Sequence, residues 1–196
     1  EEEKSGFDAD LDVTVKGLFD IKLSGGYYKV KKSEEELKLD DPEERNDEYY
    51  HAGYFLAKAG FGVGLPLGPV SLKEISGGFF VNYSVSASEV AGSDDMVDAL
   101  EKSVKPKYKS YGGMFGLGLA VGDDNFINGK ASLLLMVDIQ RDGIRVPGVV
   151  MQGEVHALCA SADAESGLVN GKVTILYEDT TTPDITEDEK KAMDAS

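Results

Sequence analysis

Hydrophobic and polar residues alternate with a period of two along much of the chain. In residues 8–16, four apolar side chains alternate with five polar ones, and the same alternation recurs in residues 130–138, 152–159 and 172–178. This period is typical of antiparallel strands that have one packed face and one solvated face. We therefore predict an all-β fold of about ten antiparallel strands, arranged as a sandwich or as a sheet of stacked hairpins.

Turn and helix signals divide the alternating segments. Asp142-Gly143 is the strongest hairpin candidate, and Pro147 shortly after it predicts an edge or a bulge. One short amphipathic helix is predicted over residues 93–104, where Ser93 is suited to the N-cap and apolar residues recur at helical spacing.

The chain is predicted to form a single β-rich domain over residues 1–180. An acidic loop at residues 33–48 is expected to be solvated, and residues 181–196 form a polar acidic tail. The chain begins without Met, so we expect it to be a processed piece of a longer protein.

Two pairs of segments repeat within the sequence. Residues 128–134 match residues 170–176, and residues 23–28 match residues 75–80, with residues 111–115 as a looser third copy. Repeated hairpins require a Gly turn followed by a strand that opens on bulky residues, as these segments do. Coincidence is the alternative, because Gly-rich turns look alike in any all-β protein.

If the first repeat is real, its two strands have equivalent environments. Leu133 and Ile175 should then both face the core. The turns Asn128-Gly129 and Asn170-Gly171 should share one backbone shape, with each Gly at positive φ.

Composition excludes several classes of function. The sequence has 20 Lys and Arg against 36 Asp and Glu, a net charge of −16, which is repelled by phosphate backbones and anionic lipid. No stretch approaches the ~18–20 apolar residues of a membrane span. We therefore expect no nucleic-acid partner and no membrane insertion. With one Cys and two His, little is left for metal or nucleophile chemistry, and we expect no enzyme and no cofactor.

Several segments resemble parts of a known group of proteins. The segments are residues 49–53, 64–69, 76–83, 126–133, 149–159 and 169–173. Taken together they resemble segments of very large, repeat-built, β-rich surface proteins of Bacteroidota, the TANFOR-type group. The resemblance covers roughly residues 49–178 and implies a secreted or surface-displayed structural module. It implies no catalytic residue.

A nucleotide-binding interpretation of the glycines is weak. Gly112, Gly116 and Gly118 have a spacing similar to that of short-chain dehydrogenases. Such a loop needs a following helix whose N-terminus holds the pyrophosphate, whereas a turn follows here. We expect strand glycines against which a backbone or a bulky ring packs closely.

Two groups of side chains are candidates for binding chemistry. Glu154 and His156 lie two residues apart on a predicted strand, so they share a face, which we expect to be solvated. Asp123, Asp124 and Asn125 could bind calcium, a cation that favours converging carboxylates and loop carbonyls.

We therefore expect a non-catalytic structural or adhesive module of an extracellular or cell-surface assembly. Its partners would be other copies or neighbouring repeat units of the same assembly. The alternative is a module that binds calcium or a glycan, the latter through exposed aromatic side chains at Tyr27, Tyr28, Tyr49 and Tyr50.

Overall fold

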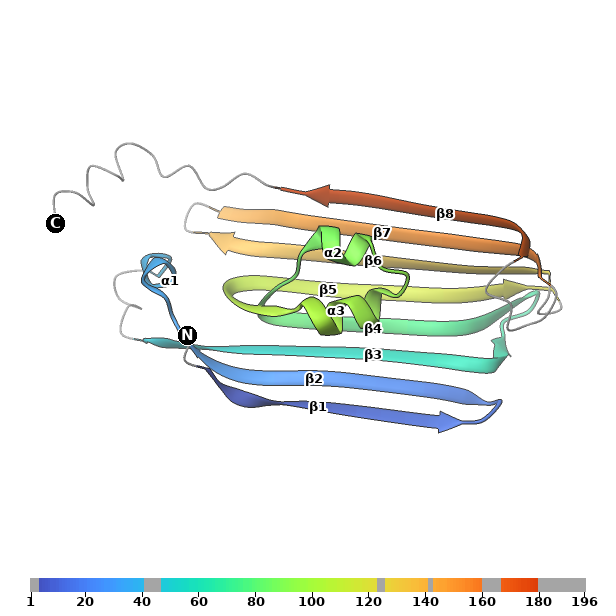
Figure 1. Cartoon of the computed structure of the whole chain (residues 1–196), viewed down its shortest axis with the longest axis horizontal. Helices are drawn as coiled ribbons and strands as arrows, with labels where there is room; N and C mark the ends of the chain where they lie inside the picture. The colour runs from blue at the N-terminus through green and yellow to red at the C-terminus, as the bar shows by residue number, and fades with distance from the viewer. Residues whose placement is uncertain (1–3, 41–46, 123–125, 141–142, 160–166, 180–196) are drawn as a thin grey trace.

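The chain folds into one antiparallel sheet of eight strands, arranged in space in the order in which they occur in the sequence (Figure 1). The computed structural model describes residues 4–40, 47–122, 126–140, 143–159 and 167–179. The elements are β1 (Lys4–Val15), β2 (Phe19–Lys31), α1 (Glu34–Lys38), β3 (Tyr49–Pro66), β4 (Val70–Ser84), α2 (Ala87–Ala91), α3 (Met96–Ser103), β5 (Lys105–Val121), β6 (Ile127–Gln140), β7 (Gly143–Cys159) and β8 (Gly167–Glu178). The all-β prediction is confirmed, with a single sheet and no second layer of strands in the described residues.

The predicted hairpin joins β6 and β7. Gln140 pairs with Gly143 at its tip, and Pro147 lies where the register shifts between Met136 and Asp138. A bulge at this point suits proline, which has no N–H to donate to the ladder.

The helix predicted at residues 93–104 is present as α3. Its N-cap is Asp95 rather than Ser93, and the Asp95 carboxylate accepts hydrogen bonds from the backbone N–H groups of Val97 and Asp98 at 2.9 and 3.2 Å. The preceding helix α2 was not predicted, because five residues are too few to show a helical period.

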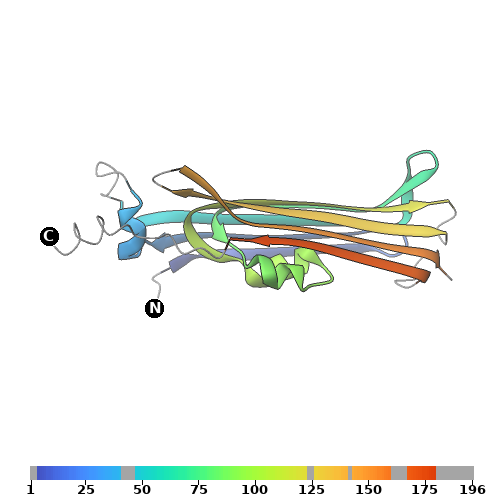
Figure 2. The ribbon, with the colours of Figure 1, turned by 90° about the horizontal axis from the view of Figure 1, so that it is seen from above.

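Both α2 and α3 lie on the same side of the sheet (Figures 1 and 2). Figure 2 also shows that the two edges of the sheet bend towards that side. We call the covered side the inner face and the opposite side the outer face. The hydrophobic core lies between the helices and the inner face and includes Val30, Ala52, Leu56, Phe80, Val90, Val97, Leu100, Met114, Leu134, Met136 and Val150.

The apolar positions of the alternating segments lie on the outer face, so the prediction that they form the core is wrong. Leu133 is 43 % exposed and Ile175 is 57 % exposed, whereas Leu134 on the inner face is 0 % exposed. The physical reason is that both helices that follow β4 cover the other face. Within the described residues, the chain supplies no layer for the outer face.

The repeat at residues 128–134 and 170–176 has a structural counterpart, but not as turns. Asn128 and Asn170 both pair with His156, from opposite sides of β7. The two segments therefore occupy equivalent positions in the sheet. Gly129 and Gly171 lie inside strands, and neither has a positive φ, so the prediction of matching turns is wrong.

The first testable prediction compares two adjacent residues, Leu134 on the inner face and Leu133 on the outer face. Leu134→Ala empties a fully buried site and should lower the free energy of unfolding by about 2–5 kcal/mol. Leu133→Ala removes a side chain that is already half in water, so it should cost less than half as much. Urea unfolding, at a protein concentration at which sedimentation shows the single chain, measures both. Equal costs, or a larger cost for Leu133→Ala, would contradict the assignment of the faces.

Candidate functional site

The outer face is the most unusual surface of the molecule. Strand register places on it the odd-numbered residues of the segments 7–15, 19–27, 53–61, 75–81, 111–121, 127–137, 149–157 and 169–177. None of these residues is charged, and the polar side-chain atoms among them are the hydroxyls of Tyr27, Tyr111 and Tyr177. Single exposed apolar residues are normal on a protein surface, but a contiguous apolar face across eight strands marks an interaction site.

The side chains of the outer face are well exposed. At its centre, Phe79 and Phe115 are 56 % and 52 % exposed, and Phe55 beside them is also exposed. The rings of Phe55 and Phe79 lie in contact across the β3–β4 pair, with centroids 6.0 Å apart. This arrangement offers aromatic side chains to an apolar partner and offers almost no hydrogen-bonding groups.

The inner face carries a network of charged side chains below α3. Lys58 and Lys130, from β3 and β6, both form ion pairs with Glu74 of β4, at 3.3 and 2.9 Å. Both lysines also pair with Asp95, the N-cap of α3. At the other side of the helix, Lys22 binds Asp98 at 2.9 Å and Glu101 at 2.6 Å.

These ion pairs shift the pKa of Asp95. Its burial by itself would raise the pKa, but the hydrogen bond from Lys58 and the charges of Lys130 and Lys58 outweigh burial and lower the pKa to about 2. The carboxylate therefore stays ionised and holds the start of α3 against the sheet. This network was not predicted from the sequence. Its one local signal is Lys58, a charged residue between Ala57 and Ala59 in a strand of mainly apolar and small residues.

The acidic loop contributes a buried ion pair. Asp40 is fully buried and accepts hydrogen bonds from Lys32 at 2.7 Å and from the Tyr108 hydroxyl at 2.6 Å, with Lys109 at 3.3 Å. Burial alone would raise the pKa of Asp40, and these three partners lower it instead. The expectation of a solvated loop is therefore wrong at Asp40, which fastens the segment after α1 to β5.

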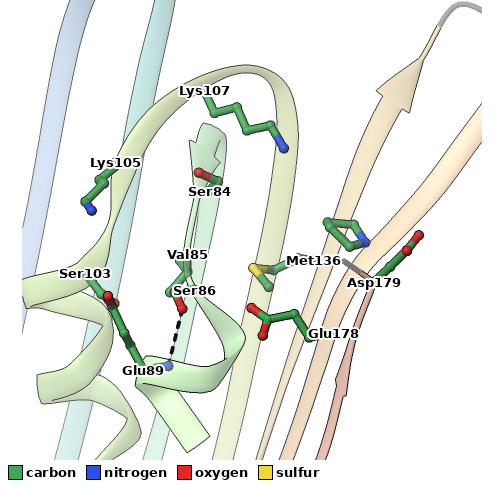
Figure 3. A pocket seen from close by; sticks show the side chains of 11 residues that line it. Ser84, Val85, Ser86, Glu89, Ser103, Lys105, Lys107, Met136, Glu178 and Asp179 are labelled. Carbon is green, nitrogen blue, oxygen red and sulfur yellow. Dashed lines mark hydrogen bonds between the residues drawn. The ribbon is translucent and has the colours of Figure 1, made fainter. Parts of the chain in front are cut away.

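A pocket of about 330 Å³ opens beside α2 (Figure 3). Its charged side chains come from separate elements: Glu89 from α2, Lys105 and Lys107 from β5, and Glu178 and Asp179 from the end of β8 and just after it. Lys107 is already paired with Asp138 at 2.6 Å. The lining residues include no His or Cys, and the Ser103 hydroxyl donates a hydrogen bond to the Ala99 backbone carbonyl at 2.7 Å rather than to a base.

The residues predicted to bind calcium cannot be placed in this fold. Asp123, Asp124 and Asn125 lie outside the described residues. In the part of the chain that is described, no group of three or more His, Cys, Asp or Glu side chains could hold a metal ion.

Glu154 and His156 share the inner face, as expected from their spacing. Each pairs across β7–β8 with a polar residue, Glu154 opposite Lys172 and His156 opposite Asn170. The His156 Nδ1 atom lies 2.8 Å from the Asn170 side-chain oxygen. Cross-strand polar pairs of this kind stabilise a sheet.

The four tyrosines suggested for glycan binding do not form one surface. Tyr27 stacks on His51 on the outer side, with ring centroids 5.5 Å apart. Tyr28 donates a hydrogen bond to Asp8 on the inner side, which raises the pKa of Tyr28 to about 12, and Tyr50 is buried in the core. The alternation of strand side chains separates these residues.

The glycines with dehydrogenase-like spacing lie inside β5. The Phe80 ring packs over Gly112, and Ser76 and Glu74 lie over Gly116 and Gly118. This is the close packing expected for strand glycines.

Comparison of the chain with protein-family models, with curated proteins and with solved structures found no match. Among the described residues, none of the helices is both long and apolar enough to cross a membrane.

The second prediction concerns the network at the start of α3. Asp95→Asn keeps a side chain suited to the N-cap but removes the charge that Lys58 and Lys130 share, so it should lower the free energy of unfolding at neutral pH by about 1–2 kcal/mol. Because the folded protein lowers the pKa of Asp95 to about 2, this difference should be complete above pH ~4 and disappear as the pH falls through ~2. Urea unfolding at a series of pH values measures it.

Asp94→Asn is the matched control. Asp94 is the preceding residue and pairs with Lys172, but its side chain is 96 % exposed. Its replacement should leave stability nearly unchanged. If the two variants behaved alike, the network would not hold α3.

Proposed function

We propose that the chain is a non-catalytic structural module of an extracellular or cell-surface assembly, and that its outer face is the contact surface. The observation that carries the proposal is the charge-free apolar face described above. Surfaces of this size and composition are contact surfaces in stable assemblies, because their burial removes a large apolar area from water.

The inner face supports a structural rather than a catalytic role. Its charged groups are engaged with one another in ion pairs that fix α3 and its N-cap Asp95 to three different strands, β2, β3 and β6. Ion pairs of this kind position helices. Catalytic carboxylates and lysines, in contrast, need a substrate cavity beside them.

The extracellular location rests on the resemblance of residues 49–178 to repeat-built surface proteins. The high negative charge is consistent with it, since surplus carboxylates keep a protein with an apolar face in solution before assembly.

The third prediction tests the contact surface with methionines as internal reporters. Met151 lies on the outer face and is 48 % exposed, whereas Met114 and Met136 are buried on the inner face. If the outer face is covered in the assembled protein, hydrogen peroxide should oxidise Met151 about as slowly as the two buried methionines. Peptide mass spectrometry of the full chain during oxidation measures the three rates.

Denatured protein provides the control, since all three methionines should then react at similar rates. Fast oxidation of Met151 in the native protein at every concentration, with Met114 and Met136 protected, would mean that the outer face stays open. The proposed function would then be wrong.

A further inference from the structure

On the outer face, large aromatic side chains lie next to glycines, which have no side chain. Phe115 of β5 lies directly beside Gly77 of β4, and Phe79 of β4 lies directly beside Gly113 of β5. On this face, therefore, an aromatic side chain and a position without a side chain alternate across one strand pair. Sites of this kind are typical of places where another chain approaches closely.

Two glycines of the outer face, Gly77 and Gly113, are not explained by packing within this chain. A Cβ atom at Gly77 or Gly113 would have only a backbone oxygen within 4 Å, at 3.7 and 3.6 Å. On the inner face the situation is reversed. A Cβ atom at Gly78 would lie 2.5 Å from the Leu56 side chain, and at Gly112 it would collide with the Phe80 ring. The fold requires the inner glycines, whereas the outer ones leave space that the described chain does not use.

We propose that the outer face packs against the outer face of a second copy of this chain, giving a two-layer dimer. This deepens the proposed function, on which it rests, by naming the partner. In a two-fold dimer the same surface must fit itself, so bulky and empty positions must both occur on it. The alternation of Phe79 and Phe115 with Gly113 and Gly77 provides this self-complementarity.

The area is sufficient for a stable dimer. Eight strands at about 4.8 Å spacing, over about nine residues of about 3.3 Å rise, give a face of about 1,100 Å² per copy. Complete burial of both faces would remove about 2,200 Å², and the four central strands alone about 1,100 Å². Because the sheet edges bend away on the inner side (Figure 2), the central strands β3 to β6 would make the first contact.

Charge favours this orientation. The ion-paired side chains Lys58, Glu74 and Lys130 lie on the inner face, whereas the outer-face residues of the segments defined above carry no charge. Packing outer face to outer face places these groups, and both helices, on opposite outsides of the dimer. Two chains that each carry a net charge of −16 then repel each other least.

The sheet edges favour a protein partner over the hydrocarbon of a bilayer. In the described residues, β1 pairs with β2 alone and β8 with β7 alone, so each leaves one edge of backbone groups unpaired. Such an edge is not tolerated in hydrocarbon, where no water can satisfy it. Strand β1 also carries Asp8, Asp10 and Asp12 at alternate positions, which is typical of edge strands that lie in water.

The experiment is sedimentation equilibrium of the full chain over a range of micromolar concentrations. The wild type should have twice the 21.0 kDa mass of one chain. Phe115→Lys places a charge at the centre of the contact and should raise the dissociation constant at least about 30-fold. The control Asp10→Asn changes the net charge by the same amount on the other side of β1 and should change the constant less than about threefold.

Gly113→Val is the second variant, which fills an empty position where the chain itself has room. It should keep the circular dichroism spectrum and weaken the dimer, so the proposal stays testable even if Phe115→Lys does not fold. Equal dimerisation of the wild type and of the folded variants would overturn the proposal.

Three results for the wild type would also overturn the dimer. They are a monomer at all concentrations, an open series of larger oligomers, and a monomer that floats with vesicles of neutral phosphatidylcholine. If Met151 were protected in the larger oligomers or in the vesicle-bound monomer, the outer face would still be a contact surface, and only the identity of its partner would be wrong. If Met151 were open, the proposed function would fail as well.

Discussion

The structure depends on one constraint: a sheet has two faces, and the described residues of this chain cover only one of them. The strands alternate in side-chain type, so each contributes to both faces at once. Helices α2 and α3 and the segment after α1 all contact the inner face or its ends. Among the described residues the outer face therefore has no covering layer, so the apolar face of the sheet is an exposed one.

The covered face has an apolar middle part next to the charged side chains of Lys58, Glu74 and Lys130, which determines where α3 sits. Leu100 and Val97 of α3 pack into the apolar part, while Asp95 reaches the lysines of β3 and β6. A helix of eight residues has little stability of its own, since isolated helices shorter than about 12–15 residues are marginal in water. Its position therefore depends on side chains of the sheet, and the ion pairs decide its orientation as well as its attachment.

The sequence predicted the strands well but misassigned their faces. The alternation around Leu133 and Leu134 shows that one face is apolar, and burial of that face is the usual consequence in a monomer. The choice between the faces depends on where α2 and α3 pack, and this is set by contacts between residues far apart in the chain, such as Lys22 with Asp98. No local pattern contains that information. The Pro147 bulge and the β6–β7 hairpin, in contrast, follow from local chemistry and were predicted correctly.

The Gly-Gly repeats also could not be interpreted correctly from the local sequence alone. Gly-Gly between bulky residues is a common turn signal, and at residues 25–26 and 77–78 it lies in the middle of strands instead. In each pair the inner glycine lies beneath a side chain of the neighbouring strand, Tyr54 over Gly26 and Leu56 over Gly78.

Packing inside the fold does not by itself explain the outer glycine of each pair. Consecutive residues in a strand point to opposite faces, so one Gly-Gly pair relieves crowding inside the fold and also leaves a space on the exposed face. At Gly77 a Cβ atom would have only the Met114 backbone oxygen within 4 Å, at 3.7 Å, whereas at Gly25 it would lie 3.2 Å from the Tyr54 backbone oxygen. The space on the outer face is therefore clearest at Gly77, beside Phe115 of β5. The fold does not require a glycine there, and the proposed second copy would supply the atoms that fill this space.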